Sequence, residues 1–185
     1  MGNSLYIILA IIALVLFLVN IYNRFVKNKN VVKDAWSNID VALKRRHDLI
    51  PNLVNIVKAY ADYEKTTFQA IVEARNKAVN LPKDDINGRI EAEKELKRSL
   101  NNFFVTVEAY PELKADQNFV NLQDQLAQIE ENLERSRRYY NGTVRINNTY
   151  GESIPGVIFA GMFKYQHFDY YEAEEDEKRE VDVKL

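Results

Sequence analysis

The sequence contains no cysteine, only two histidines and few glycines, and each shortage excludes a class of site. Without cysteine there is no disulfide, no thiol nucleophile, no cysteine metal site and no cysteine to be lipidated. A di-iron site in a helical bundle needs Glu-x-x-His motifs, but lysine (Lys44, Lys164) stands three residues before each histidine. His-Glu-x-x-His, phosphate-loop and Gly-x-Ser-x-Gly patterns are also absent. We therefore expect no catalytic residues, no metal, no cofactor and no small-molecule substrate.

Excess charge of one sign is also lacking. The formal net charge is −2, and residues 172–185, with seven acidic and three basic side chains, account for −4 and leave +2 for the rest. A nucleic-acid-binding domain would carry a strongly basic face, so we expect no nucleic-acid partner. The acidic tail, residues 172–185, has too little hydrophobic content to fold and is predicted to be disordered. Its functional alternative is a docking tail for a basic partner.

The sequence does have a long hydrophobic run near the N-terminus. Fifteen apolar residues extend from Leu5 to Val19, and with one interruption at Asn20 the run reaches Tyr22. Eighteen helical residues span about 27 Å, close to the bilayer core of about 30 Å. A cleaved secretory signal would need basic residues before the run and small residues at its end, and neither is present. We predict an uncleaved transmembrane helix over residues 5–23, after a short extension at residues 1–4.

The basic residues near this run all follow it, which predicts the orientation of the protein. Under the positive-inside rule, such an asymmetry places the remainder of the chain on the cytoplasmic side of the membrane. The lipid bilayer is thus the first expected partner. Four residues are predicted to lie at the membrane interface, the basic ones against headgroups: Tyr22, Arg24, Lys27 and Lys29.

Beyond the span, apolar residues recur at helical spacing over residues 24–150. The first pattern extends from Val32 to about Ala78 and predicts one long helix, bent near Pro51 because proline lacks the N–H of the helical ladder. A second helix is predicted to follow Asp84 or Asp85 as its cap and to reach about residue 110, and a third to follow Asp116. The fold class is therefore all-α: a transmembrane helix followed by an antiparallel bundle of three long helices with coiled-coil-like packing. The unequal lengths leave part of the first helix to pack on the C-terminal segment or on a second copy.

Residues 151–171 form an apolar and aromatic segment that differs in character from the helices before it. Its apolar part, Ile154 to Phe163, is too short to span a bilayer. It is predicted either to seal one end of the bundle, as a loop or a short fourth helix, or to contact a partner or the membrane interface. Phe159 and Phe163 are its candidate interaction residues.

A second candidate interaction region is the charged cluster from Lys44 to Asp48, next to Pro51. It could form a patch for anionic lipid, but in a continuous helix Arg46 lies about 36 Å beyond Tyr22, too far for headgroup contact. Ion pairing with acidic residues of a neighbouring helix is therefore the favoured interpretation. The candidate residues here are Arg45, Arg46, Asp48 and Pro51.

The same stretch carries a resemblance to a known family. It reads Trp36-x-x-Ile39-Asp40-x-x-Leu43-Lys44-Arg45-Arg46-x-Asp48-Leu49-Ile50-Pro51-Asn52-Leu53-Val54. This pattern, with Glu73-Ala74-Arg75 after it, resembles the LemA family, although Ile146 stands where the family commonly has a tyrosine. The resemblance implies a single-pass protein of the bacterial cytoplasmic membrane with a long-helix bundle, and relatives in magnetosome membranes suggest a part in membrane organisation.

Three hypotheses of function remain. The first is a membrane-anchored scaffold that forms a homo-oligomer or binds another membrane protein through an exposed apolar strip. The second is a protein that shapes membranes by inserting the segment Val157 to Phe163 into the lipid interface. The third, a hydrolase or metalloenzyme, would need a metal or a cluster of polar residues that the sequence does not indicate.

Overall fold

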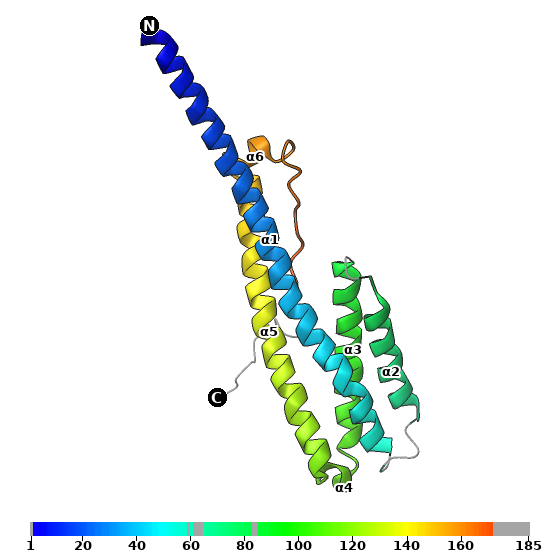
Figure 1. The fold of residues 1–185 in the computed structure, drawn as a ribbon. Coiled ribbons are helices and arrows are strands. Elements are labelled where there is room, and N and C mark those ends of the chain that lie inside the picture. Colours follow the sequence, from blue (N-terminus) through cyan, green and yellow to red (C-terminus); the bar gives the residue numbers. More distant parts are fainter. Residues whose placement is uncertain (1, 59, 61–64, 83–84, 172–185) are drawn as a thin grey trace, which may run out of the picture. The chain divides into compact units, whose positions relative to one another are not determined.

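A computed structural model describes residues 2–58, 60, 65–82 and 85–171. The predicted disorder of the acidic tail, the extension residue Met1 and the alternative cap Asp84 lie outside this part. All the regular elements of the described residues are helices, which confirms the all-α prediction (Figure 1). They are α1 (Gly2–Lys58), α2 (Lys65–Asn80), α3 (Ile86–Val107), α4 (Pro111–Lys114), α5 (Gln117–Glu152) and α6 (Gly156–Phe159).

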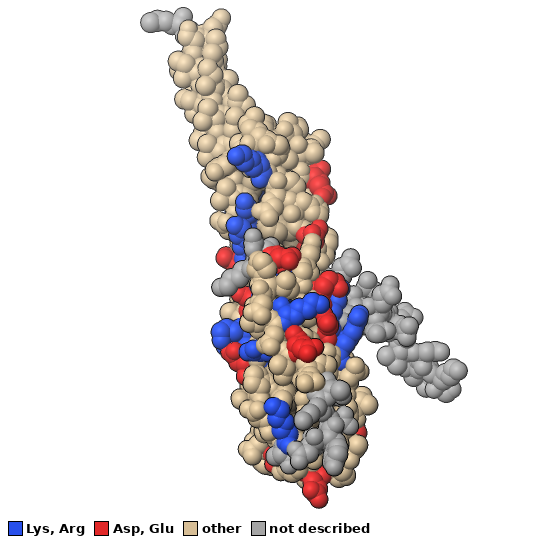
Figure 2. Space-filling model, turned by 90° about the vertical axis from the view of Figure 1, so that its right-hand side faces the viewer, with Lys and Arg blue, Asp and Glu red and all other residues tan. Residues whose placement is uncertain are grey.

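The N-terminal part of helix α1 is apolar and does not pack against other elements of the described chain. Side chains from Leu5 to Phe17 are exposed, and the first charged residue of the chain is Arg24. Figure 2 shows this end as an uncharged surface. The helix is long and apolar enough there to cross a membrane. A row of exposed leucines and isoleucines is costly in water, so lipid is the environment that this part of the helix fits.

The prediction that one helix extends from Val32 to about Ala78 is wrong. Helix α1 ends at Lys58, and the residues from Lys65 to Asn80 form a separate helix, α2, which packs against α3 (Figure 1). A continuous helix would project roughly 30 Å past Lys58, at about 1.5 Å a residue. The reversal instead buries the apolar side of α2, including Phe68 and Ile71, in the hydrophobic core.

Helix α1 continues through Pro51, where the sequence predicted a bend. Because proline has no N–H, the carbonyl of His47, four residues earlier, receives no bond from it. The Nε of Arg75, on α2, donates a hydrogen bond to this carbonyl at 3.3 Å. The helix is thus unbroken at Pro51, and a side chain from another helix satisfies the carbonyl that the proline leaves free.

The described chain divides into two compact units, each of which uses one part of α1 and one part of α5. We call residues 39–135 the helical unit. Its core is a single cluster of buried side chains from α1 to α5. It comprises Ile50, Leu53, Val54, Val57, Phe68, Ile71, Ala74, Leu96, Leu100, Phe103, Val107, Leu113, Phe119, Leu122 and Leu126.

Two aspartates begin the helices of this unit, as the sequence predicts. Asp85 caps α3 by accepting a hydrogen bond from the N–H of Gly88 at 2.9 Å. Asp116 accepts bonds from the N–H groups of Asn118 and Phe119, at 2.8 and 3.1 Å, at the start of α5. Each carboxylate supplies an acceptor to N–H groups that have no partner within their own helix.

We call the other unit, residues 2–38 and 136–170, the proximal unit, because it contains the apolar end of α1. Here the second half of α5 lies beside α1, and the chain after Glu152 forms α6 and then an extended segment (Figure 1). Trp36 packs edge-on against Tyr140, with ring centroids 5.5 Å apart. Buried apolar residues from both helices and from the extended segment complete this small core: Ile21, Phe25, Val32, Ala35, Tyr140, Val144 and Phe168.

Candidate membrane-interaction site

An aromatic cluster holds the C-terminal segment against α1 directly after the apolar run. Phe25 is its centre: its ring lies 4.9 Å from that of Tyr150, 6.0 Å from Phe163 and 5.9 Å from Tyr165. Tyr22 meets Phe163 edge-on at 5.3 Å. Two residues that the sequence singled out separately, Tyr22 and Phe163, are thus in contact, and Phe159 stacks on Phe163 at 6.0 Å. The segment of residues 151–171 packs on α1 at this point.

The same segment leaves its other apolar side chains in the open. Ile154 is 80% exposed, Val157 50%, Ile158 66% and Met162 71%. We call these four residues the exposed apolar face. Scattered single apolar residues are normal on a protein surface, but four within nine positions form a patch that marks an interaction site.

Two asparagines on α5 hold the extended chain that follows. Asn148 pairs with both backbone groups of Phe168: its Nδ2 donates to the carbonyl at 2.8 Å, and its Oδ1 accepts from the N–H at 3.2 Å. The Nδ2 of Asn147 donates to the carbonyl of Gln166 at 2.9 Å. Both asparagines are buried, so these bonds replace the water that the extended backbone would otherwise need.

A glycine and a tyrosine set the path of this chain. A Cβ on Gly156 would lie 1.9 Å from the carbonyl oxygen of Tyr150, so only glycine fits where α6 turns against α5. Further on, the hydroxyl of Tyr140 donates to the carbonyl of Asp169 at 3.0 Å. Burial, and then the nearby Asp169 carboxylate, raise the pKa of Tyr140 to about 12, so the hydroxyl keeps its proton. The C-terminal segment is therefore held at several points between Gly156 and Asp169.

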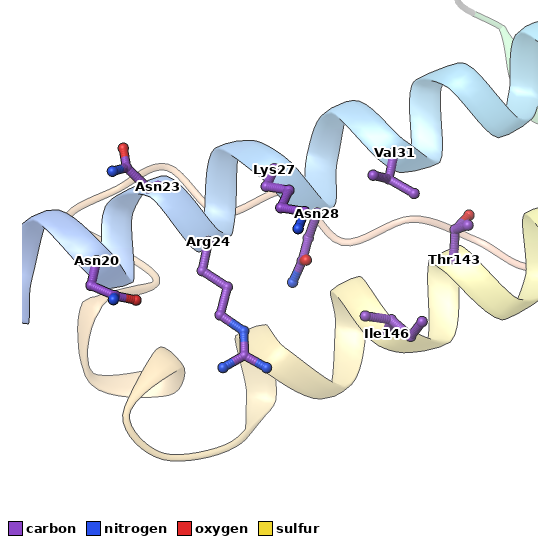
Figure 3. Close-up of a pocket in the computed structure, with 8 residues that line it drawn as sticks. All are labelled: Asn20, Asn23, Arg24, Lys27, Asn28, Val31, Thr143 and Ile146. Carbon is purple, nitrogen blue, oxygen red and sulfur yellow. The ribbon is translucent and has the colours of Figure 1, made fainter.

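A basic groove of about 600 Å³ lies between α1 and α5 in the same unit. Figure 3 shows its lining, in which Arg24 and Asn28 extend toward α5 and Asn23 points away from it. The lining residues are Asn20, Asn23, Arg24, Lys27, Asn28, Val31, Thr143 and Ile146. Of the four predicted interface residues, Arg24 and Lys27 line the groove, Tyr22 joins the aromatic cluster, and Lys29 belongs to neither.

The other candidate residues lie in the helical unit, and their surroundings differ. Arg46 is buried, with Nη1 3.2 Å from Oε2 of Glu93 and Nε 2.9 Å from Oε1 of Glu130; the second contact is an ion pair without hydrogen-bond alignment. Nε2 of the neighbouring His47 lies 2.6 Å from the other oxygen of Glu93. Arg46 thus pairs with acidic residues of neighbouring helices, the arrangement that the sequence favoured over a lipid patch.

The remaining three candidates of that cluster lie on the surface. Asp48 accepts a hydrogen bond from Lys44 at 2.6 Å, and this bond is the main cause of its lowered pKa. Arg45 and Pro51 are exposed. A second hollow, of about 230 Å³, lies beside Arg46, and Leu100, Phe104 and Glu130 are among its lining residues. Within the described part of the chain, no three histidine or acidic side chains are grouped so that they could hold a metal ion.

Sequence reasoning missed the residues that depend on tertiary contacts. Glu93 is in the middle of an apolar helix pattern, and only the structure shows that its carboxylate lies between Arg46 and His47. Asn147 and Asn148 were also missed, although two adjacent amides next to buried positions of an otherwise regular helix are a usable signal. The sequence shows that the segment containing the exposed apolar face is rich in apolar residues, but it does not show which of their side chains are exposed.

Comparison with known proteins yields one family match and several distant relatives. A model of the LemA family matches residues 35–185. Protein LemA of Metamycoplasma hominis is 25% identical over 124 residues, which are 64% of this chain and 54% of that protein. The chain thus spans about half of the length of that relative. Magnetosome proteins MamQ 1 and MamQ 2 of Paramagnetospirillum magneticum are each 21% identical over 189 residues, 89% of this chain and 70% of theirs.

The family match covers most of the chain and includes the helical unit and the C-terminal segment. The Arg46 ion pairs and the Arg75 bond to the carbonyl freed by Pro51 lie within it. These contacts give a structural reason for the residue pattern by which the sequence resembles that family. The chain belongs to the LemA family.

Proposed function

We propose that this protein is a non-catalytic scaffold of the bacterial cytoplasmic membrane, anchored by α1 and held against the bilayer a second time by the exposed apolar face. The observation that carries the proposal is the position of that face. The aromatic cluster fixes the segment to Tyr22 and Phe25, at the end of the apolar run. The interface is where a short patch of isoleucine, valine and methionine beside aromatic rings is stable.

The depth of the segment in the bilayer tests this proposal directly. Because the chain has no cysteine, a single Ile158→Cys substitution in the full chain can carry a nitroxide spin label in nanodiscs. We expect the label to be accessible to oxygen and protected from a water-soluble nickel complex. The matched control is Val105→Cys in the helical unit, 74% exposed, for which we expect the reverse. Equal exposure of both labels to the nickel complex would refute a second membrane contact.

The scaffold part of the proposal requires a protein partner, either a second copy of the chain or another membrane protein. Exposed valines on α1, α2 and α3, among them Val41, Val79 and Val105, supply apolar surface for such contacts. Mass photometry of the full chain in nanodiscs, with cross-linking in native membranes, measures the assembly. Monomers alone, without any cross-linked product, would count against the scaffold role.

The cytoplasmic placement rests on the basic residues after the span and has its own test. Val105→Cys can be treated in intact spheroplasts with a maleimide that does not cross membranes. We expect labelling only after lysis, since the helical unit would lie inside. Labelling without lysis would show that the helical unit lies outside the cytoplasm, where a different set of partners is present.

Membrane shaping is the second candidate function. A shallow wedge of apolar side chains expands one leaflet and favours curvature, and the exposed apolar face has that character. The distant relatives named as magnetosome proteins agree with a role in membrane organisation. Vesicles that contain the full chain should be smaller by cryo-electron microscopy than vesicles with the variant Ile158→Ser/Met162→Ser. Equal diameters would refute membrane shaping and leave the scaffold role as the remaining candidate.

A further inference from the structure

We propose that the basic groove of the proximal unit is a binding site for a phosphate group, supplied by the headgroup of an anionic phospholipid or by free phosphate. The inference deepens the proposed membrane role and rests on it for its lipid form. It is carried by four features of the groove: its cations, their lack of acidic partners, an unsatisfied amide and its depth relative to the membrane.

One of the two cations of the groove, Arg24, is ordered by an aromatic contact. The guanidinium carbon of Arg24 lies 4.8 Å from the centre of the Tyr150 ring. Tyr150 in turn packs on Phe25 and lies with its hydroxyl 3.5 Å from the carbonyl of Ile21. Lys27 lies one turn further along α1, on the same side of the helix. Because this ring orders Arg24 beforehand, less side-chain freedom is lost when an anion binds.

No carboxylate of the described chain forms an ion pair with Arg24 or Lys27. The contrast with Arg46 and Arg89 is clear, since both of those arginines are matched by acidic residues. The groove is lined by amides instead of acids, and Asn20 and Asn28 carry N–H donors that suit phosphate oxygens. The hydroxyl of Thr143, which also lines the groove, donates instead to the carbonyl of Tyr140 at 2.7 Å. A groove with two cations and no acid attracts an anion.

The amide of Asn28 adds an independent observation. Its Nδ2 is shielded from solvent and has no hydrogen-bond partner among the described residues. Buried donors without a partner are rare in native proteins, and each points to a missing acceptor. The side chain extends into the space between α1 and α5 (Figure 3), and the terminal torsion of asparagine is soft, so a small rotation directs the donor to an anion in the groove.

The depth of the groove selects a headgroup. Arg24 follows Tyr22, the end of the apolar run, by two residues, or about 3 Å along the helix. The headgroup layer extends about 5–7 Å beyond the hydrocarbon, so the Arg24 side chain lies within the layer that contains the lipid phosphates. Arg24 presents paired donors that match phosphate oxygens, and Lys27 adds a point charge. Basic pockets beside transmembrane helices are known to hold anionic headgroups in this way.

The test is native mass spectrometry of the full chain in detergent, titrated with phosphatidylglycerol, phosphatidylcholine or inorganic phosphate. We expect phosphatidylglycerol to be retained in preference to phosphatidylcholine. Arg24→Ala and Lys27→Ala should each weaken retention about fivefold, the change that corresponds to about 1 kcal/mol per cation. Asn28→Leu should weaken it roughly tenfold without a change in charge, because a hydrogen bond to an anion is lost.

The matched control is Lys33→Ala, which removes a nearby charge that does not line the groove. Equal weakening by Lys33→Ala and Arg24→Ala, with no effect of Asn28→Leu, would show diffuse surface attraction and overturn the site. Lack of preference for phosphatidylglycerol, together with no binding of inorganic phosphate, would also overturn it. Circular dichroism checks that each variant is folded, and Lys27→Arg, which keeps the charge, should retain binding if the site is real.

The phosphate arm identifies the source of the ligand. Displacement of phosphatidylglycerol by millimolar inorganic phosphate would show that the groove accepts the bare anion, whereas retention would assign it to the lipid headgroup. The proposed second membrane contact is separate, because it is read from the Ile158→Cys label. If that label stays in water while the groove still binds phosphate, the proposed function fails and this inference stands for the free anion.

Discussion

The two units of this chain differ in whether their charged side chains are paired with opposite charges and in whether their apolar side chains are buried. In the helical unit, buried charged side chains are paired: Glu93 contacts both Arg46 and His47, and Arg89 pairs with Asp40. The proximal unit leaves Arg24 and Lys27 without acidic partners and exposes an apolar face. A unit that satisfies its own groups is built for stability, whereas unsatisfied groups mark the surface that meets something else. The contrast agrees with the proposal that the proximal unit makes the membrane contacts.

The largest expected effect comes from breaking the pairing in the helical unit. Glu93→Gln removes the charge that Arg46 and His47 share, and leaves a buried cation with one partly exposed partner, Glu130. Breaking a buried pair from one side costs about 3–5 kcal/mol. Urea unfolding of the full chain in detergent, followed by circular dichroism, measures this loss. Glu91→Gln, which breaks an exposed pair with Lys94 on the same helix, should change little.

A result in which Glu93→Gln is as stable as the parent would show that the pairing is not what holds the helical unit. The charges would then be tolerated instead of required, as happens where an apolar substitute packs equally well. A Glu93→Leu variant separates the two cases. We expect it to be at least as unstable as Glu93→Gln, since the buried guanidinium of Arg46 keeps its charge.

The second effect concerns the clamp in the proximal unit. Asn148→Leu leaves the N–H and the carbonyl of Phe168 without their side-chain partner. Two unsatisfied backbone groups should destabilise the attachment of this segment by about 3 kcal/mol. Hydrogen exchange of residues 165–169 should become faster, while exchange in α3 stays unchanged. The control Gln166→Leu alters an exposed side chain and keeps the backbone bond to Asn147, so it should leave exchange as it is.

If Asn148→Leu also accelerated exchange in α3, the two units would unfold in one cooperative transition. They would then have no separate stabilities to compare. If it left residues 165–169 protected, aromatic packing around Phe25 alone would hold the segment. In that case, we expect Phe163→Ala to release the segment, because Tyr22 and Phe25 both contact the ring of Phe163.

A smaller effect tests the device that lets α1 pass through Pro51. Arg75→Gln removes the donor to the His47 carbonyl, and Pro51→Ala supplies that carbonyl with an N–H of its own helix. We expect the loss caused by Arg75→Gln to be smaller by about 1 kcal/mol in the Pro51→Ala background. A double-mutant cycle of urea unfolding measures this coupling. Additive effects would mean that Arg75 stabilises the fold through other contacts.

The helices were largely predictable because they depend on local patterns. The apolar spacing of α3 and α5 and the caps Asp85 and Asp116 can be read from neighbouring residues, and the structure confirms them. The break after Lys58 was not predictable in this way. Residues before and after it continue one apolar register, and only the energy of burying Phe68 and Ile71 against α3 decides for a reversal.

The candidate site was predictable only in its parts. Tyr22, Arg24, Lys27 and Phe163 were identified one by one from their distance to the span or from composition. Their contacts join segments more than a hundred residues apart, such as Phe25 with Tyr150, and no periodicity records such a pairing. The partnership of Glu93 with Arg46 and His47 is of the same kind, since an acid at a buried helix position is indistinguishable from a surface one until the neighbouring helix is placed.

The smallest effect is the pH dependence of the α5 cap, an exposed polar contact in the helical unit. A hydrogen bond from the Tyr60 hydroxyl, at 2.7 Å, and then the N–H of Phe119 lower the pKa of Asp116 from its ordinary value of 3.8. A carboxyl with a depressed folded-state pKa stabilises the fold fully above its unfolded pKa, and this stabilisation is lost as the pH falls through the folded value.

Asp116→Asn keeps a capping side chain but removes the charge. The parent should therefore be more stable than this variant at pH 7, and the difference should shrink once the pH falls below 3.8 and Asp116 becomes protonated. Urea midpoints between pH 7 and pH 2.5 measure it, with Asp124→Asn as a control that removes a surface charge of α5 without removing a cap. A constant difference across this range would mean that the cap acts through hydrogen bonding alone. Tyr60→Phe should then have the same effect at every pH, whereas a charge-dependent cap predicts that its effect also fades in acid.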